Sequence, residues 1–339
     1  MDKGRLIGIV SGFLLAIPAV ILRLFFRFIS LGSRVFSIKS RSRPACLSEP
    51  DLGVHKYSRT NGIKIHYVEA GDSEKPLLLF VHGFPEFWFS WRSQIKHFRQ
   101  NYRVVAMDTR GYNESDKPVG VDAYVMKNLI DDVKGLVEDL GVTKFTLVGH
   151  DWGGAIAWNF AAVYPDMLDN LIICNLPHVK ALEDAWRSSY AQVLKSWYIL
   201  FFQCPVLPEL FMLMEDLSVF NANMRDAKEN DPEVLEAYKY VFGSFTAWNR
   251  TINYYRAGIT EANIKFSTSI ASKLSNIKVP TLHIFGAGDK YLTLEAAKAS
   301  SKYVDNYKLE VLEDVSHWVQ QEAGTQVNTI MESFLSRKQ

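Results

Sequence analysis

The most informative segment of the chain is Val148-Gly149-His150-Asp151-Trp152-Gly153-Gly154, which lies between an apolar run at residues 145–148 and a helix-like run at residues 155–163. Small residues on both sides of Asp151 predict a sharp turn from strand to helix. Such a turn brings the two backbones close together and strains the residue at its tip. The segment therefore predicts that Asp151 is held at the tip of a strained turn.

Asp151 stands where a nucleophilic serine is usual in a turn of this kind. A carboxylate is ionised at neutral pH and needs no base to attack, and its weak nucleophilicity suits a strained or activated carbon. The residue therefore favours a covalent alkyl ester on the enzyme over ordinary peptide or ester hydrolysis. The alternative is a surface aspartate that caps the following helix, and the rest of the chain has to decide between the two.

Apolar runs typical of strands alternate with helix-like segments through most of the chain. The expected strands lie near residues 63–68, 77–81, 103–107, 145–148, 171–174, 279–288 and 308–312. This alternation predicts a mostly parallel sheet flanked by helices. The alternation stops between residues 178 and 265, where aromatic residues are frequent. We expect a helical cap there, over the carboxyl ends of the strands, where α/β sheets bind ligands.

Asp289 and His317 each follow a predicted strand, and both come after Asp151 in the chain. A lone aspartate or histidine would more often be structural. Three such residues at strand ends, in the order nucleophile, acid and histidine, predict a catalytic triad.

Five motifs together resemble those of the epoxide hydrolases of the α/β-hydrolase superfamily, above all the short membrane-anchored animal members. The motifs are His82-Gly83-Phe84-Pro85, Asp108-Thr109-Arg110-Gly111-Tyr112, residues 149–154, Gly286-Ala287-Gly288-Asp289 and Ser316-His317-Trp318. The resemblance extends from about residue 57 to residue 334. It implies an α/β-hydrolase fold with a helical cap inserted after the sixth strand. The core would comprise residues 55–177 and 266–339, and the cap residues 178–265.

The resemblance also implies a role for each residue of the site. Asp151 is the nucleophile, His317 is the base, and Asp289 is the acid that orients the base. The backbone N–H groups of Phe84 and Trp152 form the oxyanion hole, and Pro85 is a candidate for a cis peptide bond.

Two cap tyrosines hold and protonate the epoxide oxygen in that family. Residues 253–256, Asn-Tyr-Tyr-Arg, resemble the family's Asn-Trp-Tyr-Arg element and indicate Tyr255, with Tyr254 as a packing residue. Residues 197–203 resemble the second element and indicate Tyr198, for which Tyr190 is the alternative.

The sequence departs from the family pattern at two positions, Asn113 and Ser316, where glycine is common. Both residues are small, and asparagine tolerates unusual φ angles better than most residues. We therefore expect local adjustment and no loss of activity.

The implied reaction converts a lipophilic epoxide, such as one from an unsaturated fatty acid, and water to a vicinal diol, without a metal or an organic cofactor. A haloalkane dehalogenase would share the aspartate nucleophile and the tryptophan that follows it. That chemistry needs a side-chain donor for the halide near position 84, and phenylalanine offers none. A non-catalytic lipid-binding protein with a relic triad is the second alternative.

The N-terminal region predicts a membrane anchor at residues 1–30, because residues 6–22 form an uncharged, apolar run of seventeen residues. A cleaved signal peptide or an interfacial hairpin is the alternative. Basic residues are more frequent after this run than before it, which favours a single pass with the catalytic domain in the cytosol, and we expect the endoplasmic reticulum membrane. A basic, polar linker would follow at residues 31–54.

The overall composition adds few constraints. The 339 residues have a net charge of +1, which gives no reason to expect a nucleic-acid partner. Cys46, Cys174 and Cys204 lack metal-ligand spacing, and we expect buried free thiols. Two N-glycosylation sequons begin at Asn113 and Asn249, and such tripeptides often arise by chance.

Overall fold

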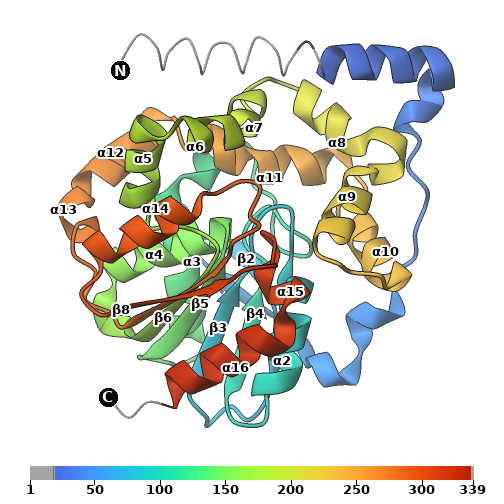
Figure 1. Cartoon of the computed structure of the whole chain (residues 1–339). Helices are drawn as coiled ribbons and strands as arrows, with labels where there is room; N and C mark the ends of the chain where they lie inside the picture. Colours follow the sequence, from blue (N-terminus) through green and yellow to red (C-terminus); the bar gives the residue numbers. More distant parts are fainter. Residues whose placement is uncertain (1–17, 19, 337–339) are drawn as a thin grey trace.

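An eight-stranded sheet runs through the computed structural model, which describes residue 18 and residues 20–336 (Figure 1). The strand order is β1-β2-β4-β3-β5-β6-β7-β8. The β1–β2 and β2–β4 pairs are antiparallel, and the remaining pairs are parallel. The strands are β1 (Val54–Thr60), β2 (Ile63–Ala70), β3 (Leu77–Val81), β4 (Arg103–Met107), β5 (Phe145–His150), β6 (Leu168–Cys174), β7 (Thr281–Gly286) and β8 (Tyr307–Leu312).

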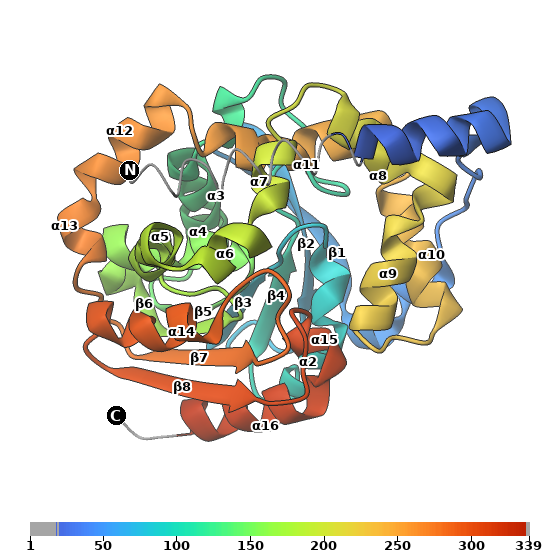
Figure 2. The same ribbon diagram turned by 45° about the horizontal axis from the view of Figure 1, so that its top comes forward.

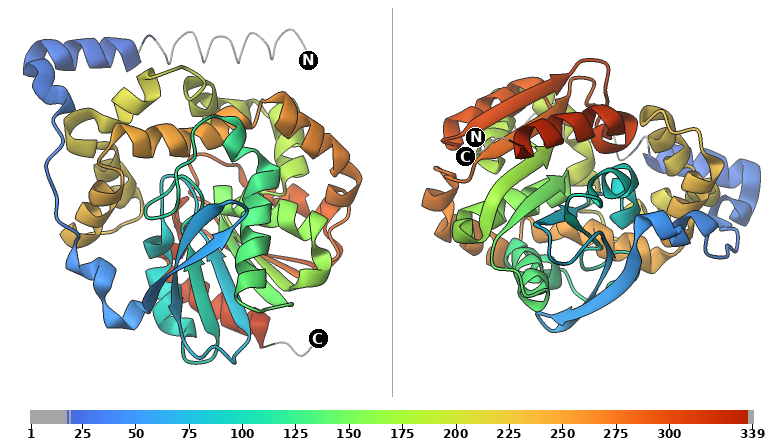
Figure 3. Two further views of the ribbon diagram at one scale, coloured as in Figure 1. Left: turned by 180° about the vertical axis from the view of Figure 1, so that it is seen from behind. Right: turned by 90° about the horizontal axis from the view of Figure 1, so that it is seen from below.

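Helices cover both faces of the sheet (Figure 3). α2 (Arg92–Phe98) and α16 (Gly324–Leu335) lie together on one face, and α3 (Met126–Asp139) and α4 (Trp152–Val163) lie together on the other. Every residue of β3, β4 and β5 is buried, as expected for parallel strands with helices on both sides. The α/β-hydrolase fold expected from the sequence is therefore confirmed.

A helical cap follows β6, which is the sixth strand of the chain, and it covers the carboxyl ends of the strands (Figure 1). After the cap the chain returns to the core, which β7, β8 and further helices complete. The cap helices are α5 (Val179–Ser188), α6 (Tyr190–Lys195), α7 (Trp197–Phe201), α8 (Leu207–Leu217), α9 (Val219–Asp226), α10 (Pro232–Val241), α11 (Phe245–Ala257) and α12 (Glu261–Ser269). Three further short helices lie outside the cap: α13 (Ala271–Leu274) precedes β7, α14 (Leu294–Ala299) follows β7, and α15 (Val319–Glu322) follows β8.

Residues 20–31 form a helix that lies along α8, at the outer side of the cap (Figure 2). Most of the apolar run at residues 6–22, on which the anchor prediction rests, lies outside the described residues. Within the described part of the chain, no helix has the length and apolar character needed to cross a bilayer.

Residues 37–53, which we call the strap, connect this helix to β1 along the side of the molecule (Figure 3). The strap contacts the cap and the core through charged side chains. Arg41 pairs with Asp216 of α8, and Arg43 pairs with Glu114 of the core. A segment with no periodic pattern in its sequence thus has specific partners.

Neither sequon presents a free asparagine amide. Asn113 Nδ2 donates a hydrogen bond to Asp108 Oδ2 (2.7 Å), and Asn249 Nδ2 donates one to Glu209 Oε1 (2.8 Å). A glycan on either nitrogen would replace one of these bonds. The three cysteines are free: Cys46 and Cys174 are buried, whereas Cys204 is partly exposed.

Candidate active site

Asp151 lies at the tip of the turn between β5 and α4, with φ 49° and ψ −118°. The glycines around it are required by close backbone contacts. A Cβ atom on Gly149 would lie 2.3 Å from the carbonyl oxygen of Gly153, and one on Gly153 would lie 2.0 Å from that of Val81. The turn therefore has the geometry that the sequence predicts for residues 148–154.

Asp151, His317 and Asp289 converge at the carboxyl edge of the sheet. His317 Nδ1 lies 2.7 Å from Asp289 Oδ2, and His317 Nε2 lies 3.6 Å from Asp151 Oδ2. All three residues are buried. The arrangement places one histidine between two carboxylates, with its two ring nitrogens facing different partners.

Backbone and side-chain donors keep Asp151 ionised. Burial raises the pKa of the carboxyl group, but the hydrogen bond and the charge of His317, the nearby His150 and the backbone N–H of Phe84 outweigh burial and lower it. The Phe84 N–H donates to Oδ1 over 2.9 Å. Oδ2, which faces His317, is thus the oxygen turned toward the rest of the site.

The charge state of His317 depends on its two carboxylate neighbours. Burial would lower the pKa of the imidazole, but Asp289 and Asp151 outweigh burial and raise it to about 10. His317 is therefore protonated at neutral pH in the ligand-free site. Asp289 has a lowered pKa despite its burial, because His317, the backbone N–H of Tyr291 and Asn175 stabilise its charge.

The two residues expected to form the oxyanion hole, Phe84 and Trp152, lie next to Asp151: the first donates its N–H to Asp151 Oδ1, and the second follows Asp151 in the chain. The peptide bond between Phe84 and Pro85 is cis, as the sequence suggests. Trp152 is the first residue of α4, so its N–H belongs to the first turn, whose donors have no partner within the helix.

Tyr198 and Tyr255 of the cap face the same space as Asp151, and their rings are 5.8 Å apart. Burial and the Asp151 carboxylate raise the pKa of Tyr198 well above its usual value, and burial together with Tyr198 does so for Tyr255. Both phenols therefore carry their protons. Tyr190, the alternative to Tyr198, is 63% exposed on the surface of the cap. Tyr254 is buried, and its hydroxyl donates to the carbonyl oxygen of Arg110 over 2.8 Å.

Two cavities meet at Asp151, Tyr198 and Tyr255. The smaller has a volume of about 170 Å³ and an aromatic lining that includes Trp197, Phe202 and Phe211. The larger has a volume of about 520 Å³, and Trp186, Leu182, Ile199, Ile259, Lys180 and Glu183 are among its lining residues. A long apolar molecule can thus extend in two directions from the carboxylate.

His150 and Glu86 form a buried network behind the site that the motif analysis overlooked. His150 Nδ1 lies 2.6 Å from Glu86 Oε2, and His150 Nε2 lies 2.8 Å from the carbonyl oxygen of His317. Glu86 also accepts hydrogen bonds from the amides of Gln320 and Gln321. Both ring nitrogens of His150 thus face oxygen acceptors. His150 lies within the motif at residues 149–154 and Glu86 directly follows the motif at residues 82–85, but only their contacts show the pairing.

Asn175 is a second residue that the sequence did not indicate. It follows β6 with φ 61°, and its Nδ2 donates to Asp289 Oδ2 over 2.7 Å. Its Oδ1 accepts from the N–H of Gly286 over 3.1 Å, so the side chain links two strand ends. The sequence feature that could have indicated Asn175 is its position, as a polar residue directly after an apolar strand.

The two departures from the family pattern are accommodated locally. Asn113 has φ 38°, a conformation that favours glycine, and Ser316 accepts a hydrogen bond from the Trp318 N–H over 3.4 Å. Neither change displaces His317 from Asp289.

One group among the described residues has side-chain atoms close enough to suggest a metal, namely His55, His66 and Glu114. Its two imidazoles contact each other over 2.8 Å, and the guanidinium of Arg43 contacts both His55 and Glu114. A cation already occupies that position, so the residues do not fit a metal ion.

The comparisons with known proteins agree with this geometry. Residues 76–323 match the family described as the alpha/beta hydrolase fold. The chain is 40% identical to human epoxide hydrolase 4 over 87% of this chain and 82% of that protein. It is 38% identical to epoxide hydrolase 1 of Caenorhabditis elegans, over 93% and 78% of the two chains. The structure resembles that of a Bacillus megaterium epoxide hydrolase in complex with an inhibitor, with a TM-score of 0.74, 30% identity, and coverage of 83% of this chain and all of that one.

Proposed function

Because the chain belongs to the epoxide hydrolases of the α/β-hydrolase superfamily, we propose that it hydrolyses lipophilic epoxides through a covalent ester on Asp151. The observation that carries this mechanism is the position of Asp151. Its Oδ1 is held by the Phe84 N–H, its Oδ2 lies 3.6 Å from His317 Nε2, and the residue lines the cavity. One oxygen is fixed and the other is available for attack.

In the first step, Asp151 Oδ2 attacks a carbon of the epoxide and the carbon–oxygen bond of the ring breaks. Tyr198 and Tyr255 donate hydrogen bonds to the departing oxygen, and one of them transfers its proton. An alkoxide released into an apolar cavity without a proton donor would be costly. The product of this step is a hydroxyalkyl ester.

Between the two steps, the imidazolium of His317 gives up its proton, which restores the proton that the tyrosine donated. In the second step, the neutral His317 removes a proton from water, and the hydroxide adds to Cγ of Asp151. The negative charge develops on Oδ1, where the N–H groups of Phe84 and Trp152 stabilise it. The bond from Cγ to Oδ2 then breaks, the proton of the new carboxyl group of Asp151 passes to the departing oxygen, and the diol leaves with that oxygen. Forming the ester removes the charge of Asp151, one of the two that raise the pKa of His317, and so makes the ring a better base.

A single turnover in oxygen-18 water tests this sequence of bonds. The first diol should contain ordinary oxygen from Asp151, and mass spectrometry should find the label in the peptide that carries Asp151. Solvent oxygen in the first diol would show that water attacks the epoxide directly, and would refute the covalent mechanism.

We infer that the substrates include epoxides of fatty-acid type. The larger cavity has a volume of about 520 Å³, its lining is mostly apolar, and Lys180 contributes an ammonium group that can meet a carboxylate. Glu183 lines the same cavity, so the two charges act in opposite directions on an anionic substrate.

We also propose that the chain is attached to the membrane of the endoplasmic reticulum, with the catalytic domain in the cytosol. This assignment rests on the sequence. The apolar run at residues 6–22 is long enough for a short span, and basic residues predominate after it. Extraction of cell membranes with alkaline carbonate tests this assignment, because an anchored protein stays in the pellet and a peripheral one is released.

A further inference from the structure

The helix at residues 20–31 contacts the protein through Val20, Leu24 and both of its arginines, and most of its other apolar side chains are exposed. Val20 is buried, and Leu24 packs against the core of the molecule. The guanidinium of Arg23 lies 5.6 Å from the ring centre of Phe211, and Arg27 Nε donates to Glu215 Oε1 over 2.9 Å. The contacts of this helix with α8 therefore use both of its arginines.

The outer side of this helix is apolar. Six of its side chains, each at least half exposed, are Ile21, Leu22, Phe25, Phe26, Phe28 and Ile29. Surface helices of globular proteins normally show the reverse pattern, with the apolar side against the protein. An exposed patch of this kind marks an interaction with an apolar partner.

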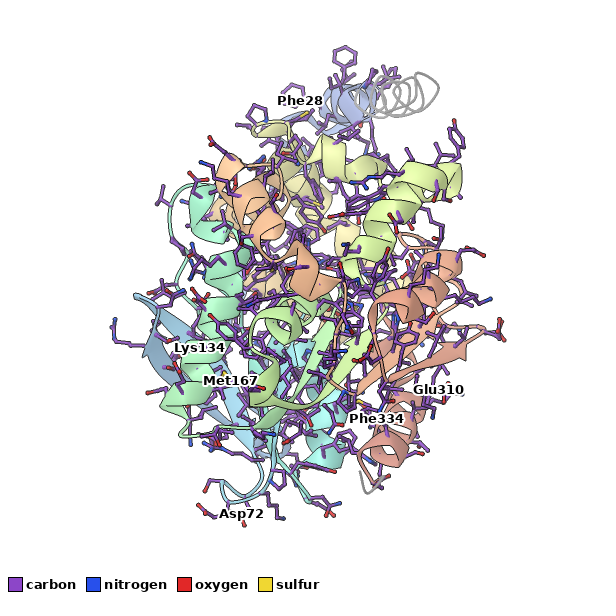
Figure 4. The ribbon with its side chains drawn as sticks, turned by 90° about the vertical axis from the view of Figure 1, so that its left-hand side faces the viewer. Phe28, Asp72, Lys134, Met167, Glu310 and Phe334 are labelled. Atoms are coloured by element: carbon purple, nitrogen blue, oxygen red, sulfur yellow. The ribbon has the colours of Figure 1, made fainter. Side chains whose placement is uncertain are left out.

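The cap continues this apolar surface. Trp186, Tyr190, Leu194 and Trp197 are all at least 36% exposed on α5, α6 and α7. These helices and the helix at residues 20–31 lie on the same side of the molecule, opposite the loop that carries Asp72 (Figures 2 and 4). Among the described residues of the core, the large apolar side chains that are comparably exposed are few: Val54, Tyr57 and Val119.

We propose that the outer side of the helix at residues 20–31, together with α5, α6 and α7, rests on the surface of a lipid bilayer. The uncharged run at residues 6–22 leads directly into this helix, so the anchor would bring this side of the molecule to the membrane. Tryptophan and tyrosine are the side chains favoured where a protein meets the headgroup region. A second copy of the chain is the alternative occupant, but the adjoining apolar run favours lipid.

The docking surface adjoins both cavities. Trp197 lines the smaller cavity and Trp186 lines the larger one, and both are partly exposed. An epoxide dissolved in the bilayer can thus reach Asp151 without crossing water. This consequence rests on the proposed epoxide hydrolysis, whereas the docking itself rests only on the proposed membrane anchor and the exposed apolar surface.

Spin-label depth measurements on the full chain in phospholipid nanodiscs test the docking. A nitroxide is attached to a cysteine introduced by Phe28→Cys or Tyr190→Cys. The control is a nitroxide at Ser73→Cys, beside Asp72. All three variants also carry Cys204→Ser, because the other two native cysteines are buried and Cys204 is the one that a label could reach. The labels at positions 28 and 190 should be reached by oxygen much more than by a water-soluble nickel chelate, and the label at position 73 should show the reverse. A label at position 190 that is fully accessible to nickel overturns the proposal. Spin–spin broadening between two copies at position 190 overturns it as well, in favour of a dimer.

A kinetic experiment separates this proposal from the proposed function. The variant Tyr190→Ser/Leu194→Ser changes exposed residues that do not line either cavity. We expect a fall of about tenfold in the hydrolysis of an epoxide dissolved in the nanodisc, because removing apolar side chains weakens interfacial binding. Hydrolysis of a small water-soluble epoxide should stay unchanged. Equal rates for the variant and the parent on both substrates would contradict entry of the substrate directly from the bilayer. A parent protein that hydrolyses neither substrate would contradict the proposed epoxide hydrolysis, but the spin-label test of docking would still be valid.

Discussion

Asp151 and His317 act on each other through charge as well as through the reaction. The pKa of His317, raised to about 10, depends on two carboxylates, Asp289 and Asp151. Removing the charge of Asp151 destabilises the imidazolium, so the pKa must fall. The variant Asp151→Asn reproduces in a stable form the charge change that ester formation causes.

We therefore predict that Asp151→Asn lowers the pKa of His317 below the value of about 10 in the parent, while turnover falls by at least about a thousandfold. Titration of ¹⁵N-labelled histidine followed by NMR measures the pKa, and Asp289→Asn, which removes the other carboxylate, should also lower it. If the Asp151→Asn and parent titrations coincide, the base is not activated by ester formation.

Replacing the base should separate the two chemical steps. In His317→Gln the carboxylate of Asp151 is still present and attack can occur, but no group remains to activate water, so the ester should accumulate. Mass spectrometry should find one substrate mass added to the peptide with Asp151. Asp151→Asn/His317→Gln is the control and should give no adduct; an adduct elsewhere would move the nucleophile.

The buried pair of His150 and Glu86 should matter for stability. Glu86→Gln removes the carboxylate that pairs with His150 in the interior, and breaking a buried pair costs about 3–5 kcal/mol. The exposed pair of His97 and Glu332, 3.6 Å apart, provides a matched control, and Glu332→Gln should change the unfolding free energy by less than about 1 kcal/mol. Urea denaturation compares the two variants. Equal effects would mean that the buried pair contributes no more to stability than the exposed one.

At the scale of the elements, the turn between β5 and α4 depends on the absence of side chains. Gly153→Ala would place a Cβ atom 2.0 Å from the carbonyl oxygen of Val81 in β3, so α4 would have to move away from the strand. We expect a loss of more than about 3 kcal/mol in the unfolding free energy. Gly258→Ala, whose Cβ would come no closer than 3.4 Å to its nearest neighbour, should be nearly neutral. Thermal unfolding distinguishes them, and a stable Gly153→Ala variant would show that the turn can relax.

The same elements show what the sequence could and could not predict. Buried parallel strands are continuous apolar runs, so β3, β4 and β5 and the residues at their carboxyl ends could be located. β1 could not, because it is an edge strand with mostly exposed polar residues. The separate helices of the cap could not either, since aromatic residues are frequent throughout it.

Long-range polar contacts also escaped prediction. Glu86 meets Gln320 and Gln321 across more than 230 residues of sequence, and no local pattern encodes that meeting. Asn175 joins Asp289 for the same reason, because only the folded sheet brings the ends of two strands together. Motifs could predict that Asp151, Asp289 and His317 lie at strand ends, but the residues that contact them required the structure.

For the whole molecule, substrate choice depends on a cavity enclosed between cap and core. Lys180 lies at the start of α5 and contacts Ser275 Oγ over 2.7 Å, and it lines the larger cavity. Lys180→Met should raise KM for a fatty-acid epoxide about five- to tenfold, the expected loss for one partly exposed ion pair. KM for its methyl ester should stay constant. Glu183→Gln should lower KM for the free acid, because it removes a negative charge from the same cavity. If Lys180→Met changes KM equally for the acid and the ester, the substrate carboxylate does not reach Lys180.

The strap makes the stability of the cap depend on the N-terminal segment. Arg41 Nη1 donates to Asp216 Oδ1 over 2.8 Å, and Arg41 Nε donates to Glu236 Oε2 over 2.7 Å, so one buried guanidinium joins α8 to α10. Arg41→Met leaves Asp216 without its main partner, while Glu236 is half exposed and can be solvated. We therefore expect a loss of about 1–3 kcal/mol, below the full cost of breaking a buried pair.

Hydrogen exchange can show where this loss acts. Faster exchange confined to α8, α9 and α10 in Arg41→Met would mean that the strap stabilises the cap locally, whereas a uniform increase would indicate global destabilisation. Arg34→Met, which changes an exposed arginine just before the strap, should leave exchange unchanged. Because α8 and α9 contribute Phe211, Met212 and Val219 to the smaller cavity, local loosening should also raise KM for long substrates more than for short ones. If KM rises equally for both, the strap does not control the shape of that cavity.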